Sequence, residues 1–234
     1  MMKRLLFIFI WLIGLLLLVY LLKIPFPTFF QSTDTTMPLA NKIIIIDPGH
    51  GGPDGGAQNQ DVKEKSITLK TAFYLKDYLQ QAGAIVYLTR ETDIDLAPDD
   101  LRGLSKRKAY DIRKRVSFIN DSHADLFISI HLNSLTDRRW KGAQTFYFSG
   151  DENEKLAKAI QERMRMISDT NREALAINHV YLLKNANKTG ALVELGFLSN
   201  EEEAQKLLDE NYQRELASGI YQGIVEYIME ESAP

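Results

Sequence analysis

The sequence predicts a single α/β domain with a central, largely parallel or mixed sheet flanked by helices, preceded by an N-terminal transmembrane helix. Apolar runs without polar alternation, such as residues 43–46, indicate strands that are covered on both faces. Segments with apolar residues at helical spacing lie between these runs, and this strand-helix-strand order favours a parallel sheet. The first 23 residues differ from the rest, because an uncharged run at residues 5–22 follows Lys3 and Arg4.

The N-terminal run predicts a membrane anchor at residues 1–23. It is about long enough to cross a ~30 Å hydrocarbon core as a helix, and the positive charges before it favour a cytoplasmic N-terminus. A cleaved signal sequence is the alternative, but its apolar core is usually shorter and ends at a small-x-small site. Residues 24–41 contain three prolines and a Ser/Thr cluster and are expected to form a stalk, which leaves residues 42–231 for the domain.

Within the domain, hydrophobic periodicity predicts each element in turn. The β-branched residues 43–46 should form a central strand, and residues 64–81 should form a helix that Gly83 ends. A further helix should stop near residue 122, and two more carry apolar stripes at residues 156–167 and 216–228. The other expected strands cover residues 84–89, 126–130, 144–148, 180–183 and 191–195.

Composition restricts the classes of function. A net charge of −3 and a pI near 5.9 do not favour nucleic acid, which usually selects a concentrated basic face. The chain contains no cysteine, so a disulfide or a thiolate metal site is excluded. Any metal must therefore be held by histidine and carboxylate.

Four polar residues follow or adjoin the expected buried strands and should emerge at one edge of the sheet. His50, Glu64 and His131 supply the three nitrogen and oxygen ligands that a catalytic zinc typically takes from protein. Glu194 is then left as a candidate general base beside the metal. A zinc ion would also explain a glutamate after a buried strand, because a buried carboxylate needs a positive partner.

Each of these residues also has a simpler interpretation when taken alone. Glu64 at a helix start would complement the helix dipole, and His131 could be a buried histidine with satisfied hydrogen bonds. The loop at residues 49–56 is rich in glycine, but it lacks the Gly-Lys-Ser/Thr or Gly-x-Gly-x-x-Gly frame of a phosphate-binding loop. The two histidines and two glutamates together therefore favour a metal site over these alternatives.

The remaining polar residues are assigned supporting or surface roles. Asp47 is expected to orient His50 or its loop. His123 and His179 are expected to be structural or exposed. The basic run between residues 102 and 115 is interpreted as mostly a solvated surface, with contact to an anionic glycan as the alternative.

These motifs resemble the zinc-dependent N-acetylmuramoyl-L-alanine amidases of the Amidase_3 family over about residues 42–229. The family pattern is matched at residues 47–52, at Glu64, and at residues 129–133 and 193–200. The resemblance implies that His50, Glu64 and His131 bind Zn²⁺ and that Glu194 is catalytic. It also implies hydrolysis of the amide between the lactyl group of N-acetylmuramic acid and L-alanine of the stem peptide. A zinc carboxypeptidase acting on stem peptides and a non-catalytic peptidoglycan-binding protein are the alternatives.

Within the family the chain is most similar to the germination-specific amidases of spore formers, on the basis of the short N-terminal anchor and of residues 95–115 and 141–146. This similarity implies a role in spore cortex maturation. Removal of stem peptides from the cortex peptidoglycan would allow muramic-δ-lactam, which is needed for germination, to form. The implied partners are the glycan strand, the stem peptide, the membrane and a regulatory protein. The implied location is the cytoplasmic membrane, with the catalytic domain extracytoplasmic, including the forespore intermembrane space.

Overall fold

The computed structural model describes residues 2–23, 37–60 and 62–231, in two compact units, Met1–Thr36 and Met37–Pro234. The first unit contains helix α1 (Met2–Lys23), and the expected stalk falls mostly on residues 24–36, outside the described residues. Among the described residues, no helix combines the length and apolar character needed to cross a membrane. The expected N-terminal helix is therefore present, but the structure does not support its expected role as a transmembrane helix.

The second unit begins a few residues before the boundary expected at residue 42. Leu39 is fully buried, and its backbone N–H donates a hydrogen bond to the carbonyl of Ala82 at 3.0 Å. Residues just before the first strand therefore pack into the domain.

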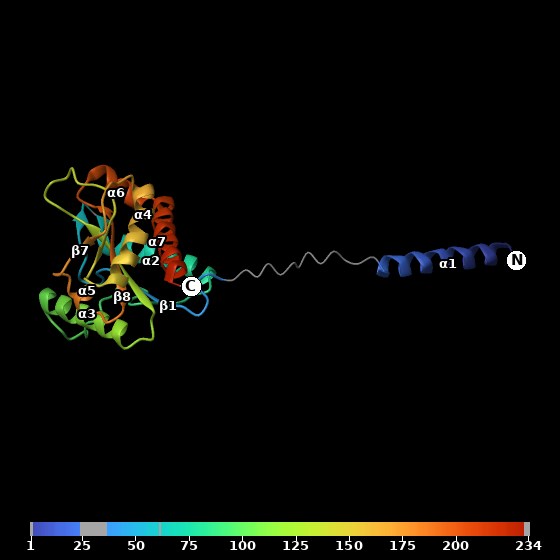
Figure 1. Ribbon diagram of the computed structural model, residues 1–234, viewed down its shortest axis with the longest axis horizontal. Helices are drawn as coiled ribbons and strands as arrows, with labels where there is room; N and C mark the ends of the chain where they lie inside the picture. The colour runs from blue at the N-terminus through green and yellow to red at the C-terminus, as the bar shows by residue number, and fades with distance from the viewer. Residues whose placement is uncertain (1, 24–36, 61, 232–234) are drawn as a thin grey trace. The chain divides into compact units, whose positions relative to one another are not determined.

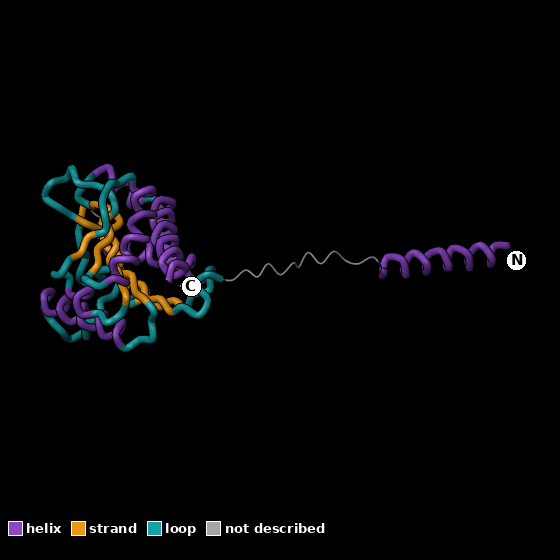
Figure 2. The backbone as a smooth tube through the Cα atoms, in the orientation of Figure 1, coloured by secondary structure: helices purple, strands orange, loops and turns teal. Residues whose placement is uncertain are grey.

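A six-stranded sheet with the order β4-β1-β5-β8-β6-β7 forms the centre of this unit (Figure 2). The first four strands in this order run parallel to one another, whereas β6 pairs antiparallel with β8 and parallel with β7. The expected mixed α/β sheet is confirmed. Its strands are β1 (Ile43–Pro48), β4 (Ile85–Leu88), β5 (Leu126–Asn133), β6 (Gln144–Tyr147), β7 (Leu175–Ala176) and β8 (Thr189–Phe197). A separate antiparallel ribbon joins β2 (Gln58–Asn59) and β3 (Val62–Lys63).

Helices cover both faces of the sheet (Figure 1). One face packs against α2, α4 and α7 around the larger buried cluster, and the other packs against α3 and α5 around a smaller cluster centred on Phe127. The helices are α2 (Glu64–Gln81), α3 (Leu104–Asn120), α4 (Asp151–Ser168), α5 (Tyr181–Asn185), α6 (Glu201–Leu208) and α7 (Glu210–Glu231). Both faces of β1 are covered, as its uninterrupted apolar sequence requires.

One expected strand is wrong. Residues 180–183 were expected to be extended, but Tyr181–Asn185 is the short helix α5. Leu182 and Leu183 are both buried in the smaller cluster, and a helical turn can direct two consecutive side chains to one side where a strand would separate them. The fold around the segment therefore overrides its local β character.

Parallel pairing brings the functional segments to one edge. Because β1, β5 and β8 are parallel neighbours, their carboxyl ends meet there, with Asp47 opposite Ser129 and His131 opposite Glu194. In open α/β sheets, binding crevices lie beyond these ends.

Candidate metal centre

The four residues expected to form the site converge at the carboxyl ends of the parallel strands. His131 belongs to β5 and Glu194 to β8, and the two residues are direct neighbours in register. His50 follows the end of β1, and Glu64 is the first residue of α2. Residues from four separate elements thus meet in one place.

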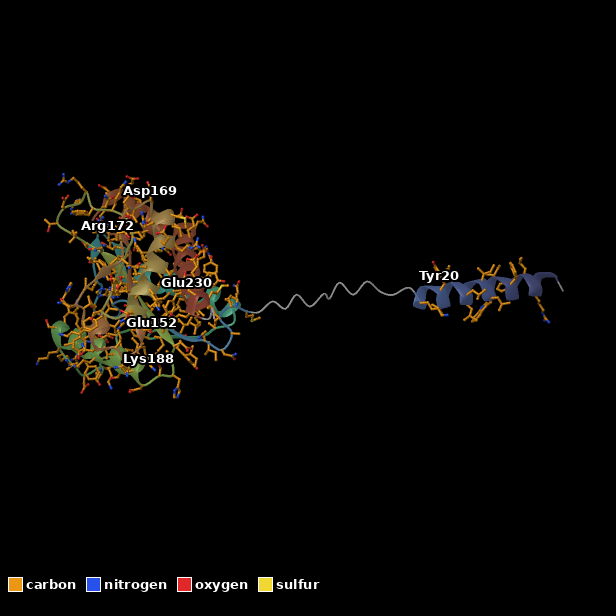
Figure 3. The ribbon with its side chains drawn as sticks, viewed as in Figure 1. Tyr20, Glu152, Asp169, Arg172, Lys188 and Glu230 are labelled. Atoms are coloured by element: carbon orange, nitrogen blue, oxygen red, sulfur yellow. The ribbon has the colours of Figure 1, made fainter. Side chains whose placement is uncertain are left out.

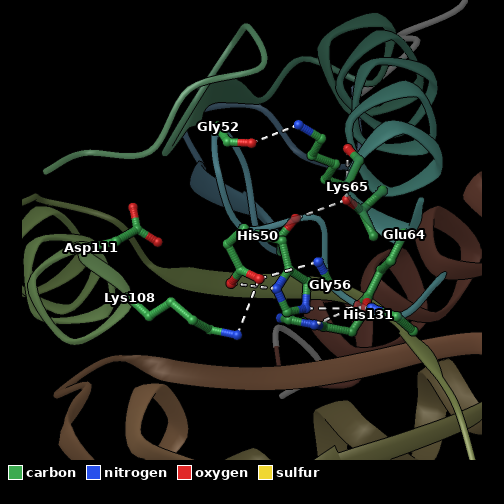
Figure 4. A network of polar contacts seen from close by, with 12 residues as sticks. His50, Gly52, Gly56, Glu64, Lys65, Lys108, Asp111 and His131 are labelled. Carbon is green, nitrogen blue, oxygen red and sulfur yellow. Dashed lines mark hydrogen bonds and ion pairs between the residues drawn. The ribbon is translucent and has the colours of Figure 1, made fainter. Parts of the chain in front are cut away.

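Three of these residues form a cluster with the spacing of metal ligands (Figure 4). Nε2 of His50 lies 3.1 Å from Oε2 of Glu64, and Nδ1 of His131 lies 2.9 Å from Oε1 of Glu64. One ligand atom from each residue lies within 4.8 Å of the others. Two imidazole nitrogens and a carboxylate oxygen, without a thiolate, match the protein donors of a catalytic zinc site.

Two glycines make this close approach feasible. A Cβ on Gly49 would lie 2.4 Å from the ring of His131, and one on Gly56, where φ is 71°, would lie 2.4 Å from Oε2 of Glu64. His50 itself has φ of 62°, in a region that non-glycine residues rarely adopt unless the surroundings enforce it. The ligand cluster packed against them therefore explains Gly49 and Gly56.

Glu64 is directed into the cluster by the backbone as well as by the histidines. It is buried, and its carboxylate accepts hydrogen bonds from the N–H groups of Ala57 at 2.7 Å and Leu132 at 2.9 Å. Burial alone would raise the pKa of Glu64, but hydrogen bonds from His131 and His50 hold the pKa well below its usual range. The carboxylate is therefore ionised at neutral pH, as a metal ligand must be.

Asp54, which the sequence analysis did not single out, orients His50. Its Oδ2 lies 2.8 Å from Nδ1 of His50, so Nε2 points toward Glu64. Burial acts to lower the pKa of His50, but the hydrogen bonds to Asp54 and Glu64 outweigh it and raise the pKa to about 9. A carboxylate on the second nitrogen of a ligating histidine is a recurrent feature of zinc sites. The signal in the sequence was an aspartate four residues after His50 in the same loop.

Glu194 lies beside the cluster, directly opposite His131 on the neighbouring strand. Its Oε2 is buried and has no hydrogen-bond partner among the described residues. Burial raises the pKa of Glu194 from its usual 4.5 to about 7, with His131 and His50 opposing the rise and Glu64 adding to it. A buried carboxyl left unpaired is costly, so this atom indicates a cation or a proton-transfer role at the site.

A buried arginine fixes the loop that carries His50. Arg115 donates hydrogen bonds to Oδ1 of Asp47 at 2.8 Å, to Oδ2 of Asp111 at 2.8 Å and to the carbonyl of His50 at 2.7 Å. Arg115 and Asp47 are each 1% exposed. Asp47 thus acts on the loop through Arg115 rather than on the ring of His50. Arg115 belongs to the basic run that was expected to be mostly solvated, but it is buried.

A second buried arginine, Arg90, ties the loop to the start of α2. It donates hydrogen bonds to the carbonyl of Gly49 at 3.0 Å and to the carbonyl of Lys65 at 2.8 Å. These two residues adjoin His50 and Glu64 in the sequence. The guanidinium therefore fixes the two ligand segments relative to each other.

A cavity of about 460 Å³ opens beside the ligands. Its wall includes Gly49, His50 and His131, and α3 supplies Lys108 and Ile112. Figure 4 shows Lys108 reaching from α3 toward the site, where its Nζ lies 3.1 Å from a carboxylate oxygen of Asp54. The cavity is large enough to hold a segment of substrate against the ligand cluster.

The two remaining histidines lie elsewhere. His123 and His179 are both exposed, and neither belongs to the group of candidate ligands found among the described residues. The expectation of a structural or exposed position is confirmed for both.

Comparison with known proteins identifies similar chains. The family profile described as N-acetylmuramoyl-L-alanine amidase, Amidase_3, matches residues 44–226. The germination-specific N-acetylmuramoyl-L-alanine amidase of Bacillus subtilis is 48% identical over 225 residues, covering 95% of each chain. The Clostridioides difficile CwlD amidase, solved in complex with the GerS lipoprotein, is 39% identical with a TM-score of 0.79, over 81% of this chain and all of that one. The catalytic domain of CwlV from Bacillus (Paenibacillus) polymyxa is 27% identical with a TM-score of 0.70, over 80% of this chain and 98% of that one.

Proposed function

The chain belongs to the Amidase_3 family of N-acetylmuramoyl-L-alanine amidases, and on that basis we propose that it uses zinc to hydrolyse the amide between the lactyl group of N-acetylmuramic acid and L-alanine. The observation that carries the proposal is the cluster of His50, Glu64 and His131 beside the unpaired carboxyl of Glu194. Three protein ligands would leave one position of a four-coordinate zinc open for water, as in catalytic rather than structural zinc sites.

The proposed roles of the residues follow from their contacts. Bound zinc would acidify a water molecule and polarise the substrate carbonyl. His50 would be held for binding by Asp54, and Glu64 by two backbone N–H groups. Glu194 would accept a proton at Oε2 and deliver it to the departing amine of L-alanine. A pKa near 7 suits a group that must both take up and release a proton at neutral pH.

The biological role we propose is maturation of spore cortex peptidoglycan for germination. The support is the 48% identity to the Bacillus subtilis germination-specific amidase over nearly the whole chain. Removal of stem peptides by this chain would supply the peptide-free muramic acid from which muramic-δ-lactam forms. Spores that lack the protein should then contain cortex without muramic-δ-lactam, which muropeptide analysis measures.

A regulatory protein partner is part of this proposal. The CwlD amidase of Clostridioides difficile was solved in complex with the GerS lipoprotein, and that amidase aligns with 81% of this chain. We propose that the domain acts outside the cytoplasmic membrane, where peptidoglycan lies. Cell fractionation combined with N-terminal sequencing would locate the mature chain and show whether residues 1–23 are retained.

Product analysis on a purified muropeptide tests the proposed reaction. Metal-loaded protein should release the intact stem peptide with a free L-alanine amine, and a chelator should abolish the release. Release of a terminal amino acid would instead identify a carboxypeptidase. Binding without any product would identify a non-catalytic peptidoglycan-binding protein.

A further inference from the structure

A row of polar side chains continues from the metal centre across the sheet. His131 on β5 is opposite Glu194 on β8, which is opposite Gln144 on the antiparallel strand β6. Residues directly opposite each other on neighbouring strands direct their side chains to the same face of a sheet. Gln144 therefore extends the face that carries His131 and Glu194, on the side away from the cavity beside α3.

Arg172 lies at the far end of this row. Its Nη1 donates a hydrogen bond to Oε1 of Gln144 at 3.0 Å, and its Nε donates to the carbonyl of Lys141 at 3.0 Å. The centre of its guanidinium lies 4.8 Å from the ring of Phe197 and 5.0 Å from the ring of Trp140. In Figure 3 Arg172 lies far from Lys188, which precedes β8, consistent with a position near the carboxyl end of that strand. Arg172 thus contacts two aromatic rings, one of which, Phe197, is the last residue of β8.

Trp140 presents an indole ring to solvent at this position. Its side chain is 49% exposed, and it belongs to neither buried cluster formed by the described residues. Core packing therefore does not account for a large aromatic ring here. The loop between β5 and β6 displays the ring next to Arg172 and Gln144. The amide nitrogen of Gln144 donates one hydrogen bond to the carbonyl of Glu173 at 3.1 Å, which leaves its second N–H for a ligand.

We propose that Trp140, Arg172 and Gln144 form a subsite for the glycan strand of the substrate, an inference that rests on the proposed amidase function. A sugar ring has an apolar C–H face that packs on an aromatic ring, while its hydroxyl and acetamido oxygens accept hydrogen bonds from guanidinium and amide groups. The subsite is continuous with Glu194 through Gln144, so it lies where the chain of sugars next to the scissile bond would pass. The stem peptide then occupies the cavity beside α3, whose wall includes Lys108 and Ile112.

Binding measurements on the full chain test the subsite. The probes are peptide-free oligosaccharides of alternating N-acetylglucosamine and N-acetylmuramic acid, and, separately, free stem tripeptide. Trp140→Ala should weaken oligosaccharide binding about tenfold or more, as expected for truncation of an aromatic anchor, and Trp140→Phe should recover most of the loss. Arg172→Met should also weaken oligosaccharide binding, and affinity for the tripeptide should stay within about twofold in every variant.

Tyr87→Ala is the matched control, because Tyr87 is 52% exposed but lies on β4 at the opposite edge of the sheet. It should bind both probes like the wild type. Unchanged oligosaccharide affinity in folded Trp140→Ala would overturn the proposal, and so would a loss of tripeptide affinity instead. Neither measurement requires hydrolysis, so a failure of the proposed reaction would appear separately, as wild-type protein that binds muropeptide without cleaving it.

Discussion

Glu194→Gln should stabilise the metal-free protein at alkaline pH, because glutamine keeps the shape of the side chain and cannot ionise. Burial raises the pKa of Glu194 from its usual 4.5 to about 7 in the folded state. At about 1.4 kcal/mol for each pKa unit, the charged form costs the folded state up to about 3 kcal/mol. The cost arises because Oε2 is buried without a hydrogen-bond partner among the described residues.

The direction of the pH dependence follows from proton binding. The folded state retains the proton of Glu194 up to about pH 7, whereas the unfolded chain releases it near pH 4.5. The contribution of this group to stability is therefore present at low pH, falls as the pH rises between these values and stays low above them. Urea unfolding with a chelator at pH 4 and pH 8 measures the effect for wild type and variant.

The difference in free energy of unfolding between Glu194→Gln and wild type should therefore increase by up to about 3 kcal/mol from pH 4 to pH 8, in favour of the variant. Glu202→Gln is a control, because that side chain is 74% exposed and loses little hydration on folding. If Glu194→Gln differed from wild type in stability by the same amount at both pH values, the account of a buried carboxyl that resists ionisation would be refuted.

The same variant, loaded with zinc, should keep the metal but lose about 10²–10⁴-fold in turnover, the usual effect of removing a general base.

Four further substitutions, one of them a control, test the site. His131→Ala should remove bound zinc and activity together, whereas His123→Ala should keep both, as metal analysis of purified protein would show. Gly56→Ala should lower zinc affinity without unfolding the domain, because the added Cβ would lie 2.4 Å from Oε2 of Glu64; zinc affinity equal to wild type would contradict the geometry. Arg115→Met should destabilise the fold by about 3–5 kcal/mol, because it leaves a buried carboxylate unpaired, and urea unfolding at pH 7 measures the loss.

Much of the fold could be predicted from hydrophobic patterns alone. The uninterrupted isoleucines of β1 and the helical spacing of α2 lead to the observed elements, because strong local periodicity and tertiary packing agree there. The segment that forms α5 was assigned wrongly, because only the surrounding cluster determines whether two adjacent leucines are buried on one side. Helix α6 was not expected, although Asn200 followed by Glu203 is a helix-capping pattern. In the structure the side chain of Asn200 accepts a hydrogen bond from the backbone N–H of Glu203.

The candidate ligands could be predicted, but the residues that hold them could not. His50, Glu64 and His131 were recognisable from residue type and from their positions at strand ends. Arg90 and Arg115 looked like ordinary charged residues, because acceptors such as the carbonyls of Gly49 and His50 are far away in the sequence. A sequence pattern cannot show such contacts, since they exist only once β1, β4 and α3 are assembled.

The central claim is that His50, Glu64 and His131 hold zinc while Glu194 stays free to transfer a proton. Anomalous diffraction at the zinc absorption edge, from crystals of the metal-loaded protein, tests this claim most directly. The account predicts one peak at roughly 2.0–2.2 Å from one atom of each of the three ligands, with Glu194 outside bonding distance. A peak bonded to Glu194 in place of Glu64, or located away from this cluster, would contradict it.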